Sequence, residues 1–120
     1  MVNSEQVVRE FIGHFHHSWP DDLRQPVALL AEDAYYQMET PSIAAVHGRE
    51  AILKVLEAMK AKVVNQKHEL IKVATLDNVV FMERIDQSYC HGKWVAVPMV
   101  AVFELNDAGK IVAWREYLDL

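Results

Sequence analysis

Apolar residues in the N-terminal part of the chain recur at helical spacing. We predict a first helix that has Ser4 as its N-cap and ends before Pro20. Its core-facing stripe comprises Val7, Val8, Phe11, Ile12, Phe15 and Trp19. Three histidines of this segment, His14, His16 and His17, fall mostly off the stripe, which predicts a solvated or partner-facing surface.

The pattern then predicts two more helices with a strand between them. The first of these helices, residues 23–30, is broken or restarted near Pro26, and a strand follows over residues 34–38. Residues 39–47 are predicted to form a loop, after which Gly48 opens the next helix. The apolar stripe of that helix comprises Ile52, Val55, Leu56 and Met59, with Leu53 at its margin.

From about Lys67 the apolar period changes to that of strands. Turn signals at residues 77–78, 91–93 and 106–110 separate four runs, which predicts an antiparallel meander. The third run, residues 95–103, is apolar on both faces, so we expect one face to enclose a core or pocket and the other to meet a second subunit. Pro98 predicts a bulge or an unpaired position in this run.

Three ionisable side chains fall on otherwise apolar strand faces. Alternation places Arg84 and Asp86 on one face with Val80, Met82 and Ser88. A solvated ion pair explains that face as well as a buried one does. Glu116 favours burial, because the other members of its face are all apolar: Val112, Trp114, Leu118 and Leu120. A buried acid–arginine–acid cluster can keep one carboxyl ionised and the other protonated, as general acid–base catalysis requires.

Composition narrows the class of protein. A chain of 120 residues suits one domain over residues 1–120, and it has no run of about eighteen apolar residues that would predict a membrane span. The net charge of −5, without a basic stripe, argues against nucleic-acid binding. No signal-peptide pattern starts the chain, so we expect a cytoplasmic protein.

The cysteine and histidine residues do not indicate a cofactor or metal site. The single cysteine, Cys90, lies beside His91 in what is predicted to be a hairpin turn, where neighbouring side chains diverge, so we interpret it as inert. His14 and His17 have a spacing that can chelate a metal on a helix, but no third ligand is evident nearby. We predict no metal site and no cofactor.

The order of elements resembles that of the nuclear-transport-factor-2-like α+β proteins. This superfamily includes SnoaL-like polyketide cyclases, ketosteroid isomerases and limonene-1,2-epoxide hydrolases, and the resemblance covers nearly the whole chain. It implies an α+β fold in which a curved, mostly antiparallel sheet wraps around helices as a cone or barrel with an internal pocket. The limonene-epoxide hydrolases in particular are similar at residues 31–37, 48–52, 83–86, 102–105 and 110–120.

In those hydrolases two acids and an arginine add water to an epoxide without a covalent intermediate. The resemblance implies that Glu116 is the base that activates water, Arg84 orients both acids, and Asp86 protonates the epoxide oxygen. Tyr36 resembles the tyrosine that positions the water. The substrate-binding residues that we expect in a hydrophobic pocket are Met38, Met82, Ser88, Val97, Met99, Trp114 and Leu118.

The chain departs from the family pattern at three places. The family base is an aspartate, one methylene shorter than Glu116. The second water-holding residue, an asparagine two positions after the tyrosine, is replaced by Met38, for which Gln37, Glu39 or Thr40 are possible substitutes. The family also continues beyond the position of Leu120, so we expect a more open cavity or one that a partner closes.

Two classes of function follow. The first is an epoxide-hydrolase-like enzyme that acts on a small hydrophobic molecule, with a homodimer formed through the meander sheet. The second is a binding or interaction domain in which the charged cluster is a satisfied network that specifies the fold. A superfamily isomerase or cyclase lies between them. The enzyme requires Glu116 within reach of a water that touches substrate, whereas the binding domain predicts a pocket sealed from the cluster.

Overall fold

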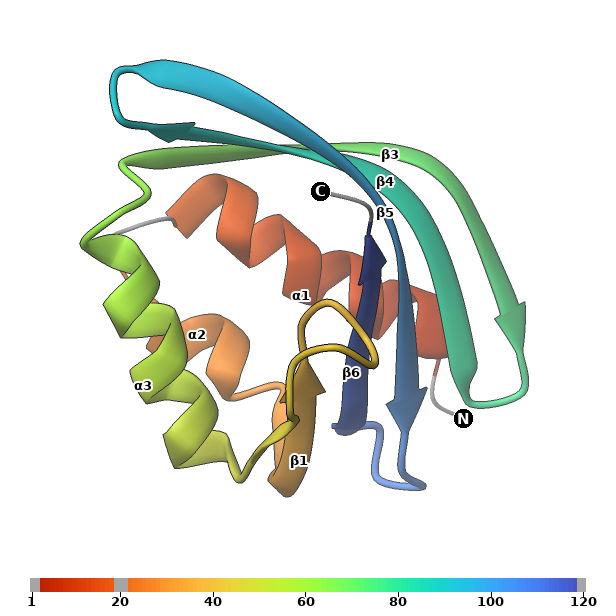
Figure 1. The fold of residues 1–120 in the computed structure, drawn as a ribbon. Helices are drawn as coiled ribbons and strands as arrows, with labels where there is room; N and C mark the ends of the chain where they lie inside the picture. Colours follow the sequence, from red (N-terminus) through yellow and green to blue (C-terminus); the bar gives the residue numbers. More distant parts are fainter. Residues whose placement is uncertain (1–2, 19–21, 119–120) are drawn as a thin grey trace.

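A six-stranded sheet curves around three helices in the computed structural model, which describes residues 3–18 and 22–118, with the backbone alone for residues 16–18 (Figure 1). The helices are α1 (Ser4–Ser18), α2 (Arg24–Val27) and α3 (Arg49–Lys60). The strands are β1 (Leu30–Gln37), β2 (Val46–His47), β3 (Asn65–Leu76), β4 (Val79–Cys90), β5 (Lys93–Leu105) and β6 (Ile111–Leu118).

The sheet combines the predicted meander with one parallel pairing. Its strand order is β2-β1-β6-β5-β4-β3. Strands β3 to β6 pair antiparallel in sequence order, as the turn signals predict, whereas β1 runs parallel to β6. All three helices lie on the concave side of the sheet (Figure 1). The α+β class and the curved, mostly antiparallel sheet are therefore confirmed.

The start of α1 differs from the prediction by one residue. Asn3 is the N-cap, because its Oδ1 accepts a hydrogen bond from the backbone N–H of Gln6 at 3.1 Å, and Ser4 is the first helical residue. The predicted end of this helix at Trp19 and Pro20 lies outside the described residues, as do the side chains of His16 and His17 and the C-terminal Asp119 and Leu120.

The predicted second helix is shorter than expected, and the strand after it begins earlier. α2 ends at Val27, and β1 begins at Leu30, four residues before the predicted start of the strand. The cause is a long-range pairing: Leu30 is in register with Ile111 of β6, and the backbone N–H of Ile111 donates to the carbonyl of Leu29 at 3.0 Å. This partner, distant in sequence, overrides a local helical pattern.

Smaller differences affect α3, the loop before it and β5. Leu53, predicted at the margin of the α3 stripe, is buried at 5% exposure, whereas Val55 is only half-buried. The predicted loop over residues 39–47 ends in the short β2. Pro98 makes no bulge, because the β4–β5 register continues through its pairing with Ile85. It lies just beyond Met99, where the described β5–β6 pairing begins.

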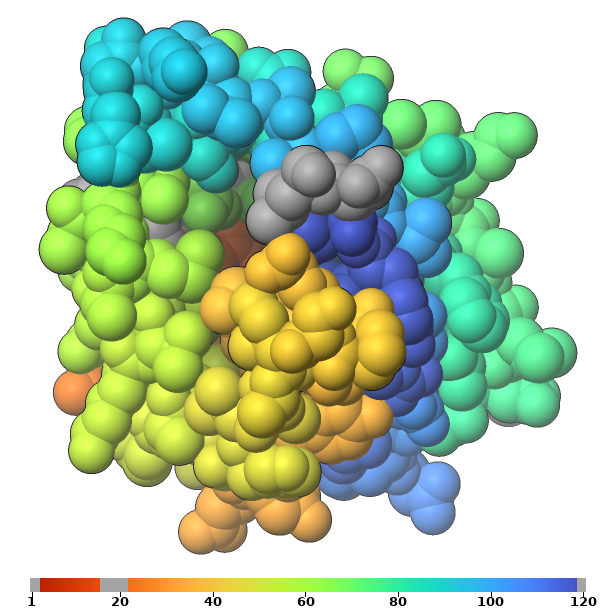
Figure 2. Space-filling model, viewed as in Figure 1, coloured from red at the N-terminus to blue at the C-terminus, as the bar shows by residue number. Residues whose placement is uncertain are grey.

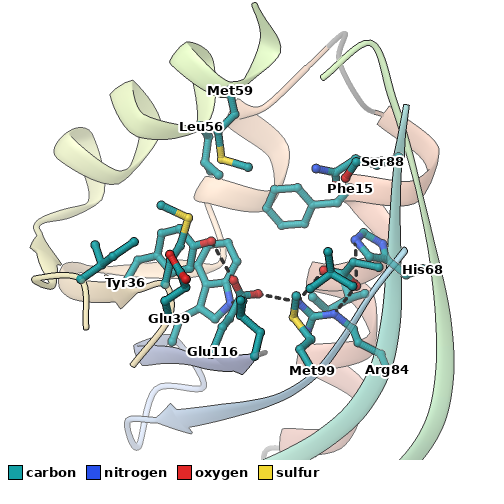
Figure 3. A pocket seen from close by; sticks show the side chains of 18 residues that line it. Phe15, Tyr36, Glu39, Leu56, Met59, His68, Arg84, Ser88, Met99 and Glu116 are labelled. Atoms are coloured by element: carbon teal, nitrogen blue, oxygen red, sulfur yellow. Dashed lines mark hydrogen bonds and ion pairs between the residues drawn. The ribbon is translucent and has the colours of Figure 1, made fainter. Parts of the chain in front are cut away.

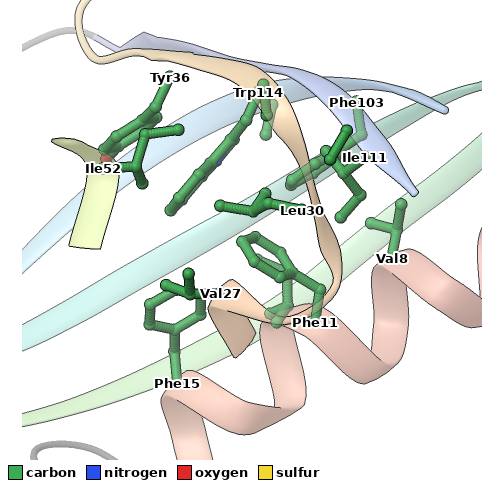
Figure 4. Packing of buried hydrophobic residues seen from close by; sticks show 14 of the residues in the cluster. Val8, Phe11, Phe15, Val27, Leu30, Tyr36, Ile52, Phe103, Ile111 and Trp114 are labelled. Carbon is green, nitrogen blue, oxygen red and sulfur yellow. The ribbon is translucent and has the colours of Figure 1, made fainter. Parts of the chain in front are cut away.

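The core fills the space between α1 and the sheet. Phe11 of α1 packs edge-on against Trp114 of β6, with ring centroids 4.9 Å apart, and against Phe103 of β5 at 6.0 Å (Figure 4). Tyr36 of β1 stacks on the other side of Trp114 at 3.7 Å. This aromatic cluster fixes the inner faces of β1 and β6 relative to the helices. Among the described residues, no helix is both long enough and apolar enough to cross a bilayer.

Candidate active site

A cavity of about 320 Å³ lies between the helices and the concave face of the sheet. Its wall includes Met59 of α3, Ile43 of the loop after β1, and Ser88 of β4. The space-filling view shows a recess bordered by α3, this loop and the hairpin between β4 and β5 (Figure 2). Most of the lining is apolar, and all of its charged groups but Glu39 lie on β4 and β6 (Figure 3).

Glu116 of β6 occupies the centre of the charged cluster. Its Oε1 accepts a hydrogen bond from the Tyr36 hydroxyl at 2.9 Å. Its Oε2 accepts from Arg84 Nη2 at 2.5 Å and from Trp114 Nε1 at 3.3 Å. Glu116 is only 5% exposed, so these three donors, and not solvent, provide most of the stabilisation of its carboxylate. Carboxylate oxygens accept about two bonds each, so Oε1 retains room for one more donor.

Arg84 of β4 connects the two acids. Its Nε and Nη2 donate to Oδ1 and Oδ2 of Asp86 at 2.7 and 3.2 Å, the paired geometry that a guanidinium offers a carboxylate. The same Nη2 reaches Glu116. Arg84 is 1% exposed, which decides for burial of a face that the periodicity left open, while Asp86 retains 18% side-chain exposure.

The protonation states of Arg84 and Tyr36 follow from these contacts. Burial alone would lower the pKa of Arg84, but the negative charges of Glu116 and Asp86 outweigh it and raise that pKa, so the guanidinium stays charged. Burial, together with the adjacent Glu116 carboxylate, raises the pKa of Tyr36 well above its usual 10.0. Tyr36 is therefore a permanent neutral donor to Glu116.

His68 of β3 adds a fourth polar group to the cluster. It is in register with Asp86 across β3 and β4, and its Nε2 lies 3.7 Å from Asp86 Oδ1. Its side chain is 6% exposed and lines the cavity. Figure 3 shows the imidazole beside Arg84 and on the same side of the cavity as Ser88.

The loop after β1 is tied to β6 beside the cluster. The backbone N–H of Thr40 donates to the carbonyl of Glu116 at 2.8 Å, and Gln37 Nε2 donates to the carbonyl of Ile43 at 2.8 Å. Of the three possible substitutes for the missing asparagine, only Glu39 lines the cavity. Gln37 and Thr40 are used in bonds within the loop, the latter through Oγ1 to the carbonyl of Gln37 at 3.3 Å.

The structure brings nearly all predicted site residues to one cavity. Those that line it are Tyr36, Met38, Arg84, Asp86, Ser88, Val97, Met99, Trp114, Glu116 and Leu118. Met82 is the exception: it is fully buried in the core, with its sulfur 3.8 Å from Arg84 Nη1, and it is not part of the cavity wall. Met82 lies on the predicted face of β4, but two residues before Arg84, where that face is part of the core.

Other lining residues were not predicted. The helices contribute Ile12, Phe15, Leu56 and Met59, whose stripes predict a core but do not indicate that part of it is hollow. Gln66 and His68 lie on β3, and their alternation signals a shared face. Locating them beside Ser88 and Asp86 requires the β3–β4 register.

The described residues contain no group of three histidine, cysteine, aspartate or glutamate side chains arranged to hold a metal ion. Cys90 is half-buried at the end of β4, where it pairs with Lys93 across the predicted hairpin turn. His14 is 3.9 Å from Glu10 on the same helix, an ordinary helical pairing.

The curved sheet, the enclosed helices and the cavity define an α+β protein with the fold of SnoaL-like and nuclear-transport-factor-2-like proteins of known structure. The family model of the limonene-1,2-epoxide hydrolase catalytic domain matches residues 2–120, and the chain belongs to this family.

Solved structures show the same fold at low sequence identity. An LEH-like epoxide hydrolase from M. tuberculosis is 23% identical, with a TM-score of 0.81 over 97% of this chain and 82% of that one. SalBIII, an epoxide hydrolase/cyclase-like enzyme in pyran ring formation of the polyether salinomycin, is 18% identical, with a TM-score of 0.82 over 98% and 91%. A protein of ketosteroid-isomerase-like fold from Catenulispora acidiphila is 20% identical, with a TM-score of 0.82 over 98% and 88%.

Proposed function

We propose that this protein adds water to a small hydrophobic epoxide in one step of general acid–base catalysis. Glu116 is the base, Asp86 is the acid, Arg84 orients both, and Tyr36 helps to position the water. The observation that carries the proposal is that a single buried guanidinium binds both carboxylates on the wall of an apolar cavity.

The bonds and protons balance without a further reactant. Glu116 takes a proton from water while the water oxygen attacks an epoxide carbon, and the carbon–oxygen bond of the ring breaks. The released oxygen takes a proton from Asp86 and becomes the second hydroxyl of a diol. Oε1 of Glu116 retains an acceptor site beside Tyr36, so a water there would meet both the base and the tyrosine hydroxyl.

The remaining lining fits the chemistry of such a substrate. Met38, Val97, Met99 and Leu118 offer apolar contacts, Trp114 offers a ring face, and Ser88 offers a hydroxyl. A pure binding domain would have its charged cluster sealed from the cavity, whereas Arg84, Asp86 and Glu116 all line it. That contact favours the enzyme over the binding domain.

The test is single-turnover hydrolysis of a panel of cyclic and aliphatic epoxides in oxygen-18-labelled water. We expect label in the diol on the first turnover, because water attacks directly and no enzyme oxygen enters the product. Glu116→Gln should lower the rate about a hundredfold to ten-thousandfold, since the amide cannot accept the proton.

Glu104→Gln is the matched control. Glu104 is a carboxylate bound by an arginine of the same sheet, Arg115, but it lies away from the cavity. Its substitution should leave turnover unchanged. A folded protein that hydrolyses none of the epoxides, or an unlabelled first product, would contradict the proposal and favour a binding domain or another chemistry of the superfamily.

We also propose that two copies of the chain associate through the convex face of the meander. Phe81, Val100 and Tyr117 are 40%, 40% and 41% exposed, and Val100 is in register with Tyr117 across β5 and β6. Such an apolar patch is typical of an interface. Sedimentation velocity should find a dimer for the wild type and a monomer for Val100→Lys; a wild-type monomer would contradict this proposal.

A further inference from the structure

When both acids of the cluster are ionised, its charge is unbalanced without His68. Arg84 supplies one positive charge, whereas Glu116 and Asp86 supply two negative charges when both are ionised. Both acids are bonded as ionised groups are, because each accepts from the guanidinium. Burying a net negative charge is costly. An imidazolium at His68, whose Nε2 lies 3.7 Å from Asp86 Oδ1, would make the group neutral.

The hydrogen bonds of Asp86 conflict with its role as an acid. Asp86 must carry a proton to act as an acid, yet its two oxygens accept hydrogen bonds from Arg84. A carboxylate in that position needs a nearby donor that can return a proton after each turnover. Histidine is the side chain whose unperturbed charge changes near neutral pH, and His68 faces Asp86 from the neighbouring strand.

We propose that His68 is the proton store of the acid half of the site, so that the acid is an Asp86–His68 pair. The inference rests on the proposed epoxide hydrolysis and deepens it. His68 acts through Asp86 and does not touch the reacting atoms, so it is a positioning residue for the proton.

The proton path balances. In each turnover the imidazolium Nε2 proton passes to Asp86, and Asp86 passes a proton to the oxygen released from the epoxide. Glu116 meanwhile gains a proton from water and releases it to solvent, and His68 takes one proton back from solvent. The 3.7 Å separation exceeds the roughly 2.6–3.2 Å of a direct transfer, so a small side-chain movement or one intervening water completes the path.

Among the described side chains, the charged groups around His68 belong to the wall of the cavity. The charged groups that line the cavity are Arg84 and Asp86 of β4, Glu116 of β6 and Glu39 of the loop after β1. The described side chains that line it from the helices are apolar: Ile12 and Phe15 from α1, Leu56 and Met59 from α3. Asp86 lies within ion-pair distance of His68.

An NMR titration of the His68 ring tests the pair without any substrate. We compare the wild type with Asp86→Asn, assigning the resonance by its loss in His68→Gln. Asp86→Asn removes the neighbouring negative charge and leaves Arg84, so the ring should titrate about one pH unit lower. An unchanged titration in a folded variant would overturn the proposal whether or not the protein hydrolyses epoxides.

A pH profile of steady-state epoxide hydrolysis tests the role of the pair. His68→Gln should lower kcat about tenfold to a hundredfold with little change in KM, because the amide cannot supply a proton. The wild-type rate should fall as pH rises through the value at which NMR finds His68 to titrate, and that fall should be absent in His68→Gln. Identical profiles for both proteins would overturn the proposal.

His14→Gln is the matched control, since it makes the same substitution on the outer part of α1, where the imidazole pairs with Glu10. It should leave the rate and the pH profile unchanged. If no epoxide reacts with any variant while the NMR titration still responds to Asp86→Asn, the coupling of the pair stands and the proposed reaction fails. The two failures are thus distinguishable.

Discussion

Two clusters of similar composition lie back to back on this sheet. On the concave face, Glu116 accepts from Tyr36 and Arg84. On the convex face, Arg115 donates to Tyr35 at 2.6 Å and to Glu104 at 2.5 Å. Both clusters use neighbouring residues of β1 and of β6, since alternation sends consecutive side chains to opposite faces.

The two clusters differ in how far solvent reaches their side chains. The side chains of Arg84 and Glu116 are 2% and 7% exposed, whereas those of Arg115 and Glu104 are 21% and 38% exposed. The inner cluster borders a cavity and the outer one does not. The presence of a tyrosine, an arginine and a glutamate in contact is therefore uninformative about chemistry. Exclusion of water and access to a cavity give the inner cluster its capacity for catalysis.

The largest difference between the clusters is expected from removal of their arginines. Arg84→Ala should lower the free energy of unfolding by about 3–5 kcal/mol, because it leaves two carboxylates without their shared cation in a buried site. Arg115→Ala should cost less than about 1 kcal/mol, as expected for a partly exposed pair. Urea denaturation of both variants measures the contrast, and equal losses would contradict it.

The second-largest difference is expected in the stability cost of removing the hydroxyl of each cluster's tyrosine. Tyr36→Phe removes a buried bond to a charged acceptor and should cost about 1.5–3 kcal/mol, whereas Tyr35→Phe should cost less than about 1 kcal/mol. The pH dependence sharpens this contrast. The pKa of Tyr36 is raised in the folded state, so its contribution is complete below the unfolded value of 10.0 and is lost as pH rises further.

Above that pH the unfolded tyrosine releases its proton while the folded one keeps it, which lowers stability by about 1.4 kcal/mol per pH unit. Denaturation at several alkaline pH values should therefore give a steeper loss for the wild type than for Tyr36→Phe. Parallel slopes would show that Tyr36 titrates alike in the folded and unfolded chains.

The smallest expected effect concerns Met38, which replaces the water-holding asparagine of the family. Met38→Asn should raise the rate of epoxide hydrolysis about threefold to tenfold, because an amide oxygen near the cavity can accept a hydrogen bond from water that a thioether accepts poorly. Initial rates measure it, with Met38→Leu as the control that changes shape without adding an acceptor. A lower rate for Met38→Asn would indicate that Glu39 already serves this purpose.

Strand periodicity predicted which charged residues share a face and that Glu116 is buried, but not the burial of Arg84. Arg84 and Asp86 share a face by count alone, and the apolar neighbours of Glu116 predicted its burial. The meander was equally accessible, since its turn residues fall where the structure turns. Each of these inferences depends on spacing within a single strand.

Features that depend on contacts between distant segments could not be predicted from the sequence. Leu30 was assigned to a helix because its strand partner, Ile111, is far along the chain. His68 carries no local sign of its position opposite Asp86, because register across a hairpin is set by the whole pairing. The hollow between α3 and the sheet likewise depends on how large side chains meet in three dimensions, which their periodicity does not encode.

The pairing of β1 with β6 has a consequence for how the site comes into existence. Tyr36 and Glu116 are separated by 80 positions, and their strands lie side by side in parallel. Closing so long a loop costs entropy that local contacts do not repay, so such pairings form late in folding. We therefore expect the site to be assembled only when the sheet is complete. An incompletely folded chain would lack the base–tyrosine contact altogether, and binding of a cavity ligand would report on the integrity of the whole domain.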